Sequence, residues 1–107
     1  MITFTLLGAF DAPTGFICEG HAGYGDRGYD IVCAAVSALT ITCVNALDSL
    51  TGATPKVSQM PQQGYLSVDC QGESNDSLHD TQLLLRALYL GIKDIAQQYP
   101  KHVMLSK

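Results

Sequence analysis

Two segments near the start of the chain, residues 2–9 and 15–22, have the composition and turn-bounded length of β-strands. Residues 10–15 between them read Phe-Asp-Ala-Pro-Thr-Gly and supply turn-forming residues, so the two segments are expected to pair as a hairpin. Side chains alternate between the two faces of a strand. This alternation places His21 and Cys18 on opposite faces of the second segment.

A long apolar helix is expected after the hairpin, from Ile31 to about Leu50. Asp30 is a suitable N-cap for it, because its carboxylate accepts hydrogen bonds from amides that have no partner in the first turn. Gly52 is a suitable C-terminal stop. The helix is apolar on almost every side, so we expect both a sheet and a partner subunit to cover it. Its large apolar residues are Ile31, Val32, Val36, Leu39, Ile41, Val44, Leu47 and Leu50.

In the second half of the chain the sequence again predicts two strands followed by a helix. Residues 56–60 and 64–70 read as a second hairpin. A second helix is expected to be capped between Asn75 and Ser77 and to stop at Pro100. Residues 102–105 predict a short closing strand. The apolar residues of the second helix recur at helical spacing and predict one buried face; they are Leu78, Leu84, Leu85, Leu88, Ile92, Ile95 and Tyr99.

The predicted order ββαββαβ indicates a single α+β domain over residues 1–107, a two-layer sandwich with a mostly antiparallel sheet and two helices. A chain of 107 residues has room for one modest core. Hydrophobic residues make up 47% of the chain and charged residues only 15%, a low charged fraction for so small a protein. We therefore expect a homodimer, in which a second copy covers part of the apolar surface.

Charge and composition argue against several partners and locations. The net charge is −4, the pI is about 5.0, and the six Lys and Arg residues form no basic run. Direct nucleic-acid binding is therefore not expected, because neutralising phosphates needs clustered cations. The chain begins without the features of a secretory signal. The apolar run from Ile31 to Leu47 is too short for a membrane span and contains polar residues. We expect a cytoplasmic protein with reduced thiols and no membrane association.

The candidate chemistry lies in a histidine, a glycine-rich loop and a cysteine. His21 and Cys33 are twelve positions apart, and Cys33 is the third residue of the expected helix if Asp30 is its N-cap. A thiol attacks as the thiolate, and with an ordinary pKa of about 8.5 only a few per cent is ionised at neutral pH. The helix dipole stabilises a thiolate at this position by about 0.3–1 kcal/mol, which corresponds to less than one unit of the thiol pKa. A neighbouring base is therefore needed. The glycines of the loop are Gly23, Gly25 and Gly28.

His21 is the histidine closest in sequence to Cys33, and the flexible loop allows the chain to return so that the two side chains lie within about 3 Å. His21 and Cys33 are thus the candidate base and nucleophile. Amides of the loop and the helix start can supply an oxyanion hole. Asp30 is interpreted first as a cap and second as a residue that orients His21. Ser37, one turn beyond the cysteine, bonds either near the site or to its own helix backbone.

Spacing alone leaves a structural role open for these residues. A buried cysteine is usually a small hydrophobe, and a histidine is usually a satisfied polar group. Tyr24 and Tyr29 of the loop are candidates to stack on a substrate, although exposed loop tyrosines are common. His79 and His102 are interpreted as ordinary surface residues.

The four cysteines also raise the alternatives of a disulfide and a zinc site. Cys33 and Cys43 are ten residues apart in one expected helix, a separation of roughly 15 Å, which is too far for a disulfide or a shared zinc ion. Cys18 and His21 form a C-x-x-H sequence but point to opposite faces of their expected strand. Cys70 has no partner nearby in sequence. We therefore expect no metal and no disulfide framework.

A longer motif surrounds the two candidate residues. It reads Gly20-His21-Ala22, then Gly28-x-Asp30-Ile31-Val32-Cys33-Ala34-Ala35-Val36-Ser37. This motif resembles the ribosomal-processing cysteine proteases of the Prp family, and the similarity extends over the whole chain in length and in ββαββαβ order. The resemblance implies that His21 and Cys33 form a catalytic dyad supported by Asp30 and Ser37. It also implies a homodimer and a mobile substrate loop; the loop residues singled out here are Gly23, Tyr24, Gly25, Gly28 and Tyr29.

The resemblance implies a cytoplasmic cysteine endopeptidase that needs no metal or cofactor. Its implied substrate is the bacterial large-subunit ribosomal protein numbered twenty-seven, which carries a short hydrophobic N-terminal extension. Such an extension needs an apolar groove, and Tyr24, Tyr29 and the dimer edge are the candidates to line it. Two other functions stay open: a non-catalytic ribosome-assembly binding protein and a zinc-binding domain.

Overall fold

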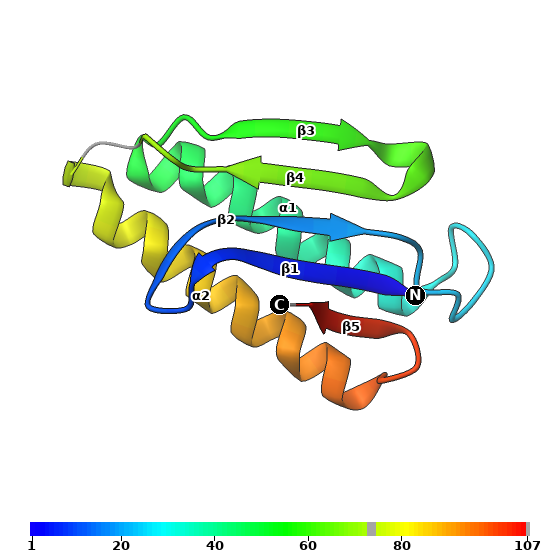
Figure 1. Cartoon of the computed structure of the whole chain (residues 1–107). Helices are drawn as coiled ribbons and strands as arrows, with labels where there is room; N and C mark the ends of the chain where they lie inside the picture. Colours follow the sequence, from blue (N-terminus) through cyan, green and yellow to red (C-terminus); the bar gives the residue numbers. More distant parts are fainter. Residues whose placement is uncertain (73–74, 107) are drawn as a thin grey trace.

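The computed structural model describes residues 1–72 and 75–106 and confirms the α+β fold class (Figure 1). The elements follow the predicted order ββαββαβ. The sheet has the strand order β3-β4-β2-β1-β5, and all neighbours are antiparallel except the pair β1 and β5, which is parallel. The elements are β1 Ile2–Ala9, β2 Ala12–Glu19, α1 Ile31–Thr51, β3 Lys56–Met60, the 3₁₀ turn η1 Pro61–Gln63, β4 Tyr65–Asp69, α2 Asn75–Gln98 and β5 Val103–Ser106.

Both helices cover the same face of the sheet, so the molecule has two layers (Figure 1). Alternate residues of the strands point into the space between the layers, as the period of a strand requires. Phe4 of β1 and Phe16 of β2 stack there with their ring centroids 5.4 Å apart, and both side chains are fully buried. The sheet contributes further buried side chains to this core, namely Ile2, Cys18, Leu66, Val68 and Val103.

The start of β2 differs from the sequence prediction. The strand begins at Ala12 rather than residue 15, and the turn shrinks to residues 10 and 11. Pro13 is accommodated inside the strand because it pairs with Gly8 next to an irregularity in β1, the kind of position where a strand tolerates proline. The strand also ends at Glu19 instead of residue 22. His21 consequently lies beyond the strand.

The predicted limits of α1 are confirmed. Asp30 is the N-cap, and Gly52 ends the helix with a φ of +71°, a conformation that favours glycine. By length and composition α1 is apolar enough to cross a membrane. In the single chain 28% of this apolar stretch is buried, and its buried residues are Val32, Val36, Thr40, Cys43 and Leu47.

The second helix lies beside the first. Gly91 of α2 sits so close to α1 that a Cβ there would be 2.9 Å from Cδ1 of Leu39. Leu85, Leu88 and Ile92 are buried, which confirms the predicted apolar face. Leu78 lies seven residues before Leu85, on the same side of the helix, but it is in the first turn and is 38% exposed. The residues directly before Asn75 lie outside the described part of the chain, so the predicted cap is not described.

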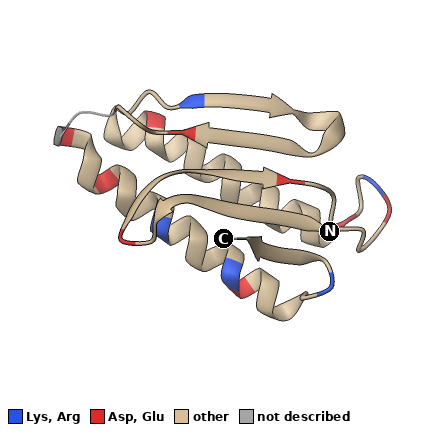
Figure 2. Cartoon of the chain, in the orientation of Figure 1, with Lys and Arg blue, Asp and Glu red and all other residues tan. Residues whose placement is uncertain are grey.

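Charged side chains lie mainly toward the ends of elements and in the loops (Figure 2). Helix α1 carries one charged residue, Asp48, near its C-terminal end. Several of its apolar side chains are exposed: Ile31, Leu39, Ile41 and Leu50. These four side chains are spread around α1, and cover by a partner subunit stays a prediction.

Candidate active site

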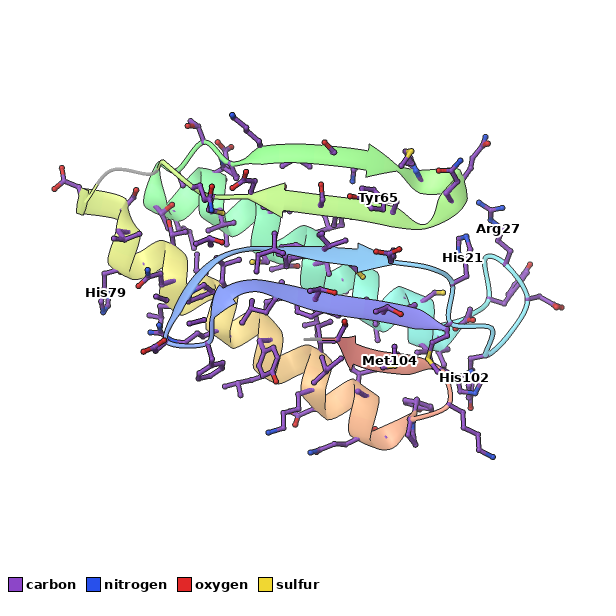
Figure 3. All side chains as sticks on the ribbon, in the orientation of Figure 1. His21, Arg27, Tyr65, His79, His102 and Met104 are labelled. Atoms are coloured by element: carbon purple, nitrogen blue, oxygen red, sulfur yellow. The ribbon has the colours of Figure 1, made fainter. Side chains whose placement is uncertain are left out.

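His21 follows the end of β2 at one end of the sheet (Figure 3). The preceding Gly20 has a φ of +100°, which turns the chain away from the strand direction. Its N–H donates to the carbonyl of Gly64 at 2.9 Å, so the turn at the start of β4 is tied to the end of β2. The ring of His21 rests against this turn, with Nε2 3.3 Å from the carbonyl oxygen of Gln62. A carbonyl only accepts, so Nε2 carries the proton of this bond.

Cys33 is the third residue of α1, the position expected from the sequence. Its sulfur accepts a hydrogen bond from the backbone N–H of Ala22 at 3.2 Å. Ala22 directly follows His21, and this contact brings the thiol next to the end of β2. Hydrogen bonds to a charged partner are the stronger ones, so the contact stabilises most when the sulfur is negative.

Asp30 is the residue that holds the loop against the helix. Its Oδ1 accepts from the amides of Val32 at 2.9 Å and Cys33 at 3.0 Å, which confirms the predicted cap. Its Oδ2 accepts from the amides of Tyr24 at 2.9 Å and Gly25 at 3.1 Å. The Cys33 amide contributes most to lowering the pKa of Asp30 below its ordinary value, against the opposing effect of burial. The carboxylate is thus ionised and bonded to four amides.

This arrangement corrects three expectations about the site. Among the described residues no hydrogen bond joins the His21 ring to Cys33, although the two were expected to lie within about 3 Å; the sulfur bonds to the Ala22 amide instead. The ring of His21 bonds to the carbonyl of Gln62, and within the described residues no bond joins it to Asp30, so the orienting role expected of Asp30 has no contact to support it. The amides of Val32 and Cys33 were expected to help form an oxyanion hole. They donate to Asp30 instead, because the cap and the nucleophile share the first turn of the helix.

Two cavities meet at His21, Cys33 and Ser37, which line both of them. The first has a volume of about 240 Å³ and lies between α1 and the β3–β4 hairpin; its apolar lining includes Ile2, Val36, Ile41 and Leu66. The second has a volume of about 330 Å³ and lies under the loop; Gly23, Gly25, Gly28, Arg27 and Asp30 line it. The predicted dyad therefore sits where two open cavities join.

The comparisons with known proteins agree with this geometry. A family model described as cysteine protease Prp matches residues 1–104. The chain belongs to the cysteine protease Prp family. The ribosomal processing cysteine protease Prp of Staphylococcus aureus is 31% identical over 93 residues, which are 87% of this chain and 85% of that protein. The Prp of Bacillus subtilis is 26% identical over 92 residues, covering 85% and 82%.

Solved Prp structures have the same fold. A crystal structure of Staphylococcus aureus Prp with a covalently linked product peptide matches with a TM-score of 0.87 at 30% identity, covering 99% of this chain and 98% of that one. A second structure of that Prp, with a substrate peptide, has a TM-score of 0.82 at 28% identity and the same coverage. The chain described here is accordingly a cysteine protease with the ββαββαβ fold of Prp.

The loop tyrosines of this Prp chain lie apart from the two cavities. Tyr24 packs edge-on against Tyr99 and His102, with ring centroids 5.3 Å apart in both pairs. Tyr29 is 85% exposed at the loop surface. Glycines and Arg27, rather than these tyrosines, form the loop side of the cavity. Contact of Tyr29 with a bound peptide stays a prediction.

Sequence reasoning overlooked His102, which was interpreted as a surface residue. It is half-buried at the same end of the molecule as His21, whereas His79 lies at the opposite end (Figure 3). Its Nδ1 is 2.9 Å from the carbonyl oxygen of Ala22. These two residues are 80 positions apart, and no local sequence pattern indicates such a contact.

The other cysteines have buried positions. None of the four cysteines forms a disulfide within the described part of the chain. Cys18 lines the apolar cavity beside Cys33, and burial, followed by the nearby Cys33 and Glu19, raises its pKa to about 11. Burial likewise raises the pKa of Cys43 to about 11. Among the described residues, no group of three or more His, Cys, Asp and Glu side chains is placed to hold a metal ion.

Proposed function

We propose that this Prp-family protease removes a short hydrophobic N-terminal extension from a bacterial large-subunit ribosomal protein, the one numbered twenty-seven. The observation that carries the proposal is the junction of two cavities at His21 and Cys33. A peptide bound across that junction has its scissile bond at the thiol and its chain in both cavities. The names of the Staphylococcus aureus and Bacillus subtilis relatives support ribosomal processing as the role.

In the proposed reaction His21 accepts the proton of the Cys33 thiol, and the sulfur attacks the carbonyl carbon of the scissile bond. A new C–S bond forms and the carbonyl oxygen becomes an oxyanion. The tetrahedral species then collapses as His21 returns the proton to the departing amine, which breaks the C–N bond. Water, deprotonated by His21, hydrolyses the thioester and releases the leader as a carboxylate. The proton finally returns to Cys33.

The apolar cavity supports a hydrophobic leader as the substrate. Its walls combine aliphatic side chains of α1, β1 and β4 with Pro61 of the turn. Burying one apolar side chain of a peptide there contributes about 1.5–3 kcal/mol, enough to select the leader over a polar sequence. Arg27, Asp30 and the loop glycines line the other cavity, which takes the peptide chain on the other side of the scissile bond.

The proposal includes a homodimer in the cytoplasm. Exposed apolar side chains along α1 support it, because a free surface rarely leaves so many uncovered on one helix. Leu50 is 76% exposed and lies far along α1 from the cavities. Leu50→Lys is expected to shift the mass measured by light scattering from two chains to one. A wild-type protein that is monomeric at micromolar concentration would contradict the dimer.

Mass spectrometry of the extended ribosomal protein after incubation with this protein tests the proposed function. We expect one truncation near the N-terminus, abolished by Cys33→Ala and by His21→Ala. Cys43→Ala and His79→Ala are matched controls, since both residues lie away from the cavities, and they should keep the activity. A substrate that binds but stays intact would favour the ribosome-assembly binding protein. Stoichiometric zinc in the purified protein would favour the zinc-binding domain.

A further inference from the structure

The turn between α2 and β5 reaches the active-site end of the molecule through His102 (Figure 3). Within this turn the N–H of His102 donates to the carbonyl of Tyr99 at 2.9 Å, which fixes its backbone. The side chain crosses to the end of β2, where Nδ1 lies 2.9 Å from the carbonyl oxygen of Ala22. Because a carbonyl oxygen accepts, Nδ1 must carry the hydrogen of this bond.

Ala22 is held on two sides. Its carbonyl accepts from His102, and its N–H donates to Sγ of Cys33 at 3.2 Å. The residue is 2% exposed, so its backbone is also confined by packing. The carbonyl belongs to the peptide unit after the Ala22 Cα and the N–H to the unit before it, so holding the carbonyl in place restricts the Ala22 backbone dihedrals that relate the two units. The bond to His102 therefore helps to keep the N–H aimed at the sulfur.

The aromatic neighbours of His102 hold its ring. Tyr24 meets it edge-on, with interplanar angle 82°, and meets Tyr99 in the same way at 80°. Tyr24 is itself fixed through its amide, which donates to Asp30. These contacts join the first part of the glycine-rich loop to the C-terminal turn. The contact with Tyr24 thus restricts rotation of the His102 imidazole.

The Ala22 N–H donates to the Cys33 sulfur, whereas neighbouring amides donate to another acceptor. The amides of Val32, Cys33, Tyr24 and Gly25 all donate to the carboxylate of Asp30. The Ala22 N–H, in contrast, points at the sulfur itself. It is placed to interact with negative charge on the thiolate and then with the oxyanion that forms beside the new C–S bond.

We propose that His102 is a positioning residue of this protease, which acts through the Ala22 carbonyl to keep the Ala22 N–H directed at the reacting sulfur of Cys33. The inference rests on the proposed function in so far as Cys33 is the nucleophile. His102 itself lines neither cavity. Its loss lowers the rate of the covalent step and leaves peptide binding unchanged.

The variants His102→Leu, His102→Asn and His79→Leu test this role. Leucine fills similar space without a donor. Asparagine places its Nδ2 on Cγ, where histidine has Nδ1, and so retains a donor at the same reach. His79 is 82% exposed at the far end of the molecule and controls for loss of any histidine.

We expect His102→Leu to lower kcat by up to about 100-fold with KM within about 2-fold, the loss that a misplacement of about 1 Å by a mutation away from the reacting atoms can cause. His102→Asn should recover most of the rate, and His79→Leu should match the wild type. Thermal unfolding of each variant is measured in parallel. An unchanged kcat in His102→Leu, or an asparagine variant as slow as the leucine variant, would overturn the proposal.

A second readout separates this inference from the proposed function. Iodoacetamide alkylation of Cys33 at pH 7.5, followed by peptide mass mapping, does not require cleavage of a substrate. We expect His102→Leu to slow alkylation by about 3–10-fold, the factor that one hydrogen bond contributes. Failure of the wild type to cleave the ribosomal protein would refute the function alone. Equal alkylation rates in both proteins would refute the role of His102 alone.

Discussion

The carboxylate of Asp30 accepts a hydrogen bond from the backbone N–H of Cys33 at 3.0 Å. The same carboxyl group receives the amides of two loop residues through its other oxygen. The helix that carries Cys33 and the loop that forms one cavity wall are therefore joined through a single side chain. Asp30 caps the helix through Oδ1 and holds the loop through Oδ2. Variants of Asp30 can therefore separate the two roles.

Asp30→Asn is expected to keep the helix cap and lose the loop contacts. The Asn carbonyl oxygen can still accept from Val32 and Cys33, but the NH₂ group cannot accept from the loop amides. We expect near-normal thermal stability, faster hydrogen exchange at Tyr24 and Gly25, and about 10-fold lower activity. Asp30→Ala should lose the cap as well and lower Tm by about 4–8 °C. Equal Tm losses in the two variants would contradict this separation.

Asp30 should stay ionised as the pH falls to its ordinary pKa of 3.8, because its pKa in the folded protein is lower. Its pKa is lowered in the folded protein from an ordinary 3.8, chiefly by the Cys33 amide. The stabilisation from this carboxylate is therefore fully present above pH 3.8 and is lost as the pH falls through the lower, folded-state value. Hydrogen exchange of the Tyr24 amide measured at pH 5 and pH 7, corrected for intrinsic rates, should show equal protection. Loss of protection by pH 5 would contradict the lowered pKa.

Gly64→Ala is expected to displace His21. Gly64 has a φ of +64°, and a Cβ there would clash with the Gly20 carbonyl and lie 3.0 Å from Cε1 of His21. Gly72→Ala is a matched control, because its φ is +86° and nothing lies within 4 Å of the added atom. Both variants carry the cost of a left-handed alanine, about 1 kcal/mol. Only Gly64→Ala should also lose activity, by at least about 10-fold in a peptide-cleavage assay; equal activities would refute the contact.

Alkylating reagents should distinguish the thiols at pH 8. Cys33 faces both cavities, whereas Cys18 and Cys43 are buried with pKa values of about 11. Since the thiolate is the reactive form, iodoacetamide should modify Cys33 first and leave the two buried thiols largely intact. Peptide mass mapping over time measures the order. A urea-unfolded sample is the control in which all four react, and equal labelling of Cys18 and Cys33 in the folded protein would contradict the prediction.

Cys18 and Cys43 should make the free energy of unfolding decrease at alkaline pH. Their pKa is raised from 9.0 in the folded state, so the stability they contribute is complete below pH 9.0 and is lost as the pH rises toward about 11. We expect the free energy of unfolding to fall by about 1–3 kcal/mol per thiol across this range. Denaturant titrations at several pH values measure it. Cys43→Val should show a smaller alkaline loss than the wild type, and an identical loss would contradict this origin.

The sequence by itself determined the elements whose signals are local. The cap at Asp30, the stop at Gly52 and the apolar periodicity of both helices each depend on residues within a turn or two of one another, so they could be predicted without a partner segment. The motif around His21 and Cys33 likewise indicated the family. The start of β2 was mispredicted because turn propensity at residues 10–15 was overruled by pairing with β1, a non-local interaction.

Only the tertiary structure decided what surrounds the two candidate catalytic residues. The contact of His21 with Gln62 spans 41 positions, and that of Ala22 with His102 spans 80. Periodicity indicates which side of an element is buried, but not which distant residue lies opposite it. That choice follows from the register of β4 and the parallel pairing of β5 with β1, which bring two separate turns to the same end of the sheet as Cys33.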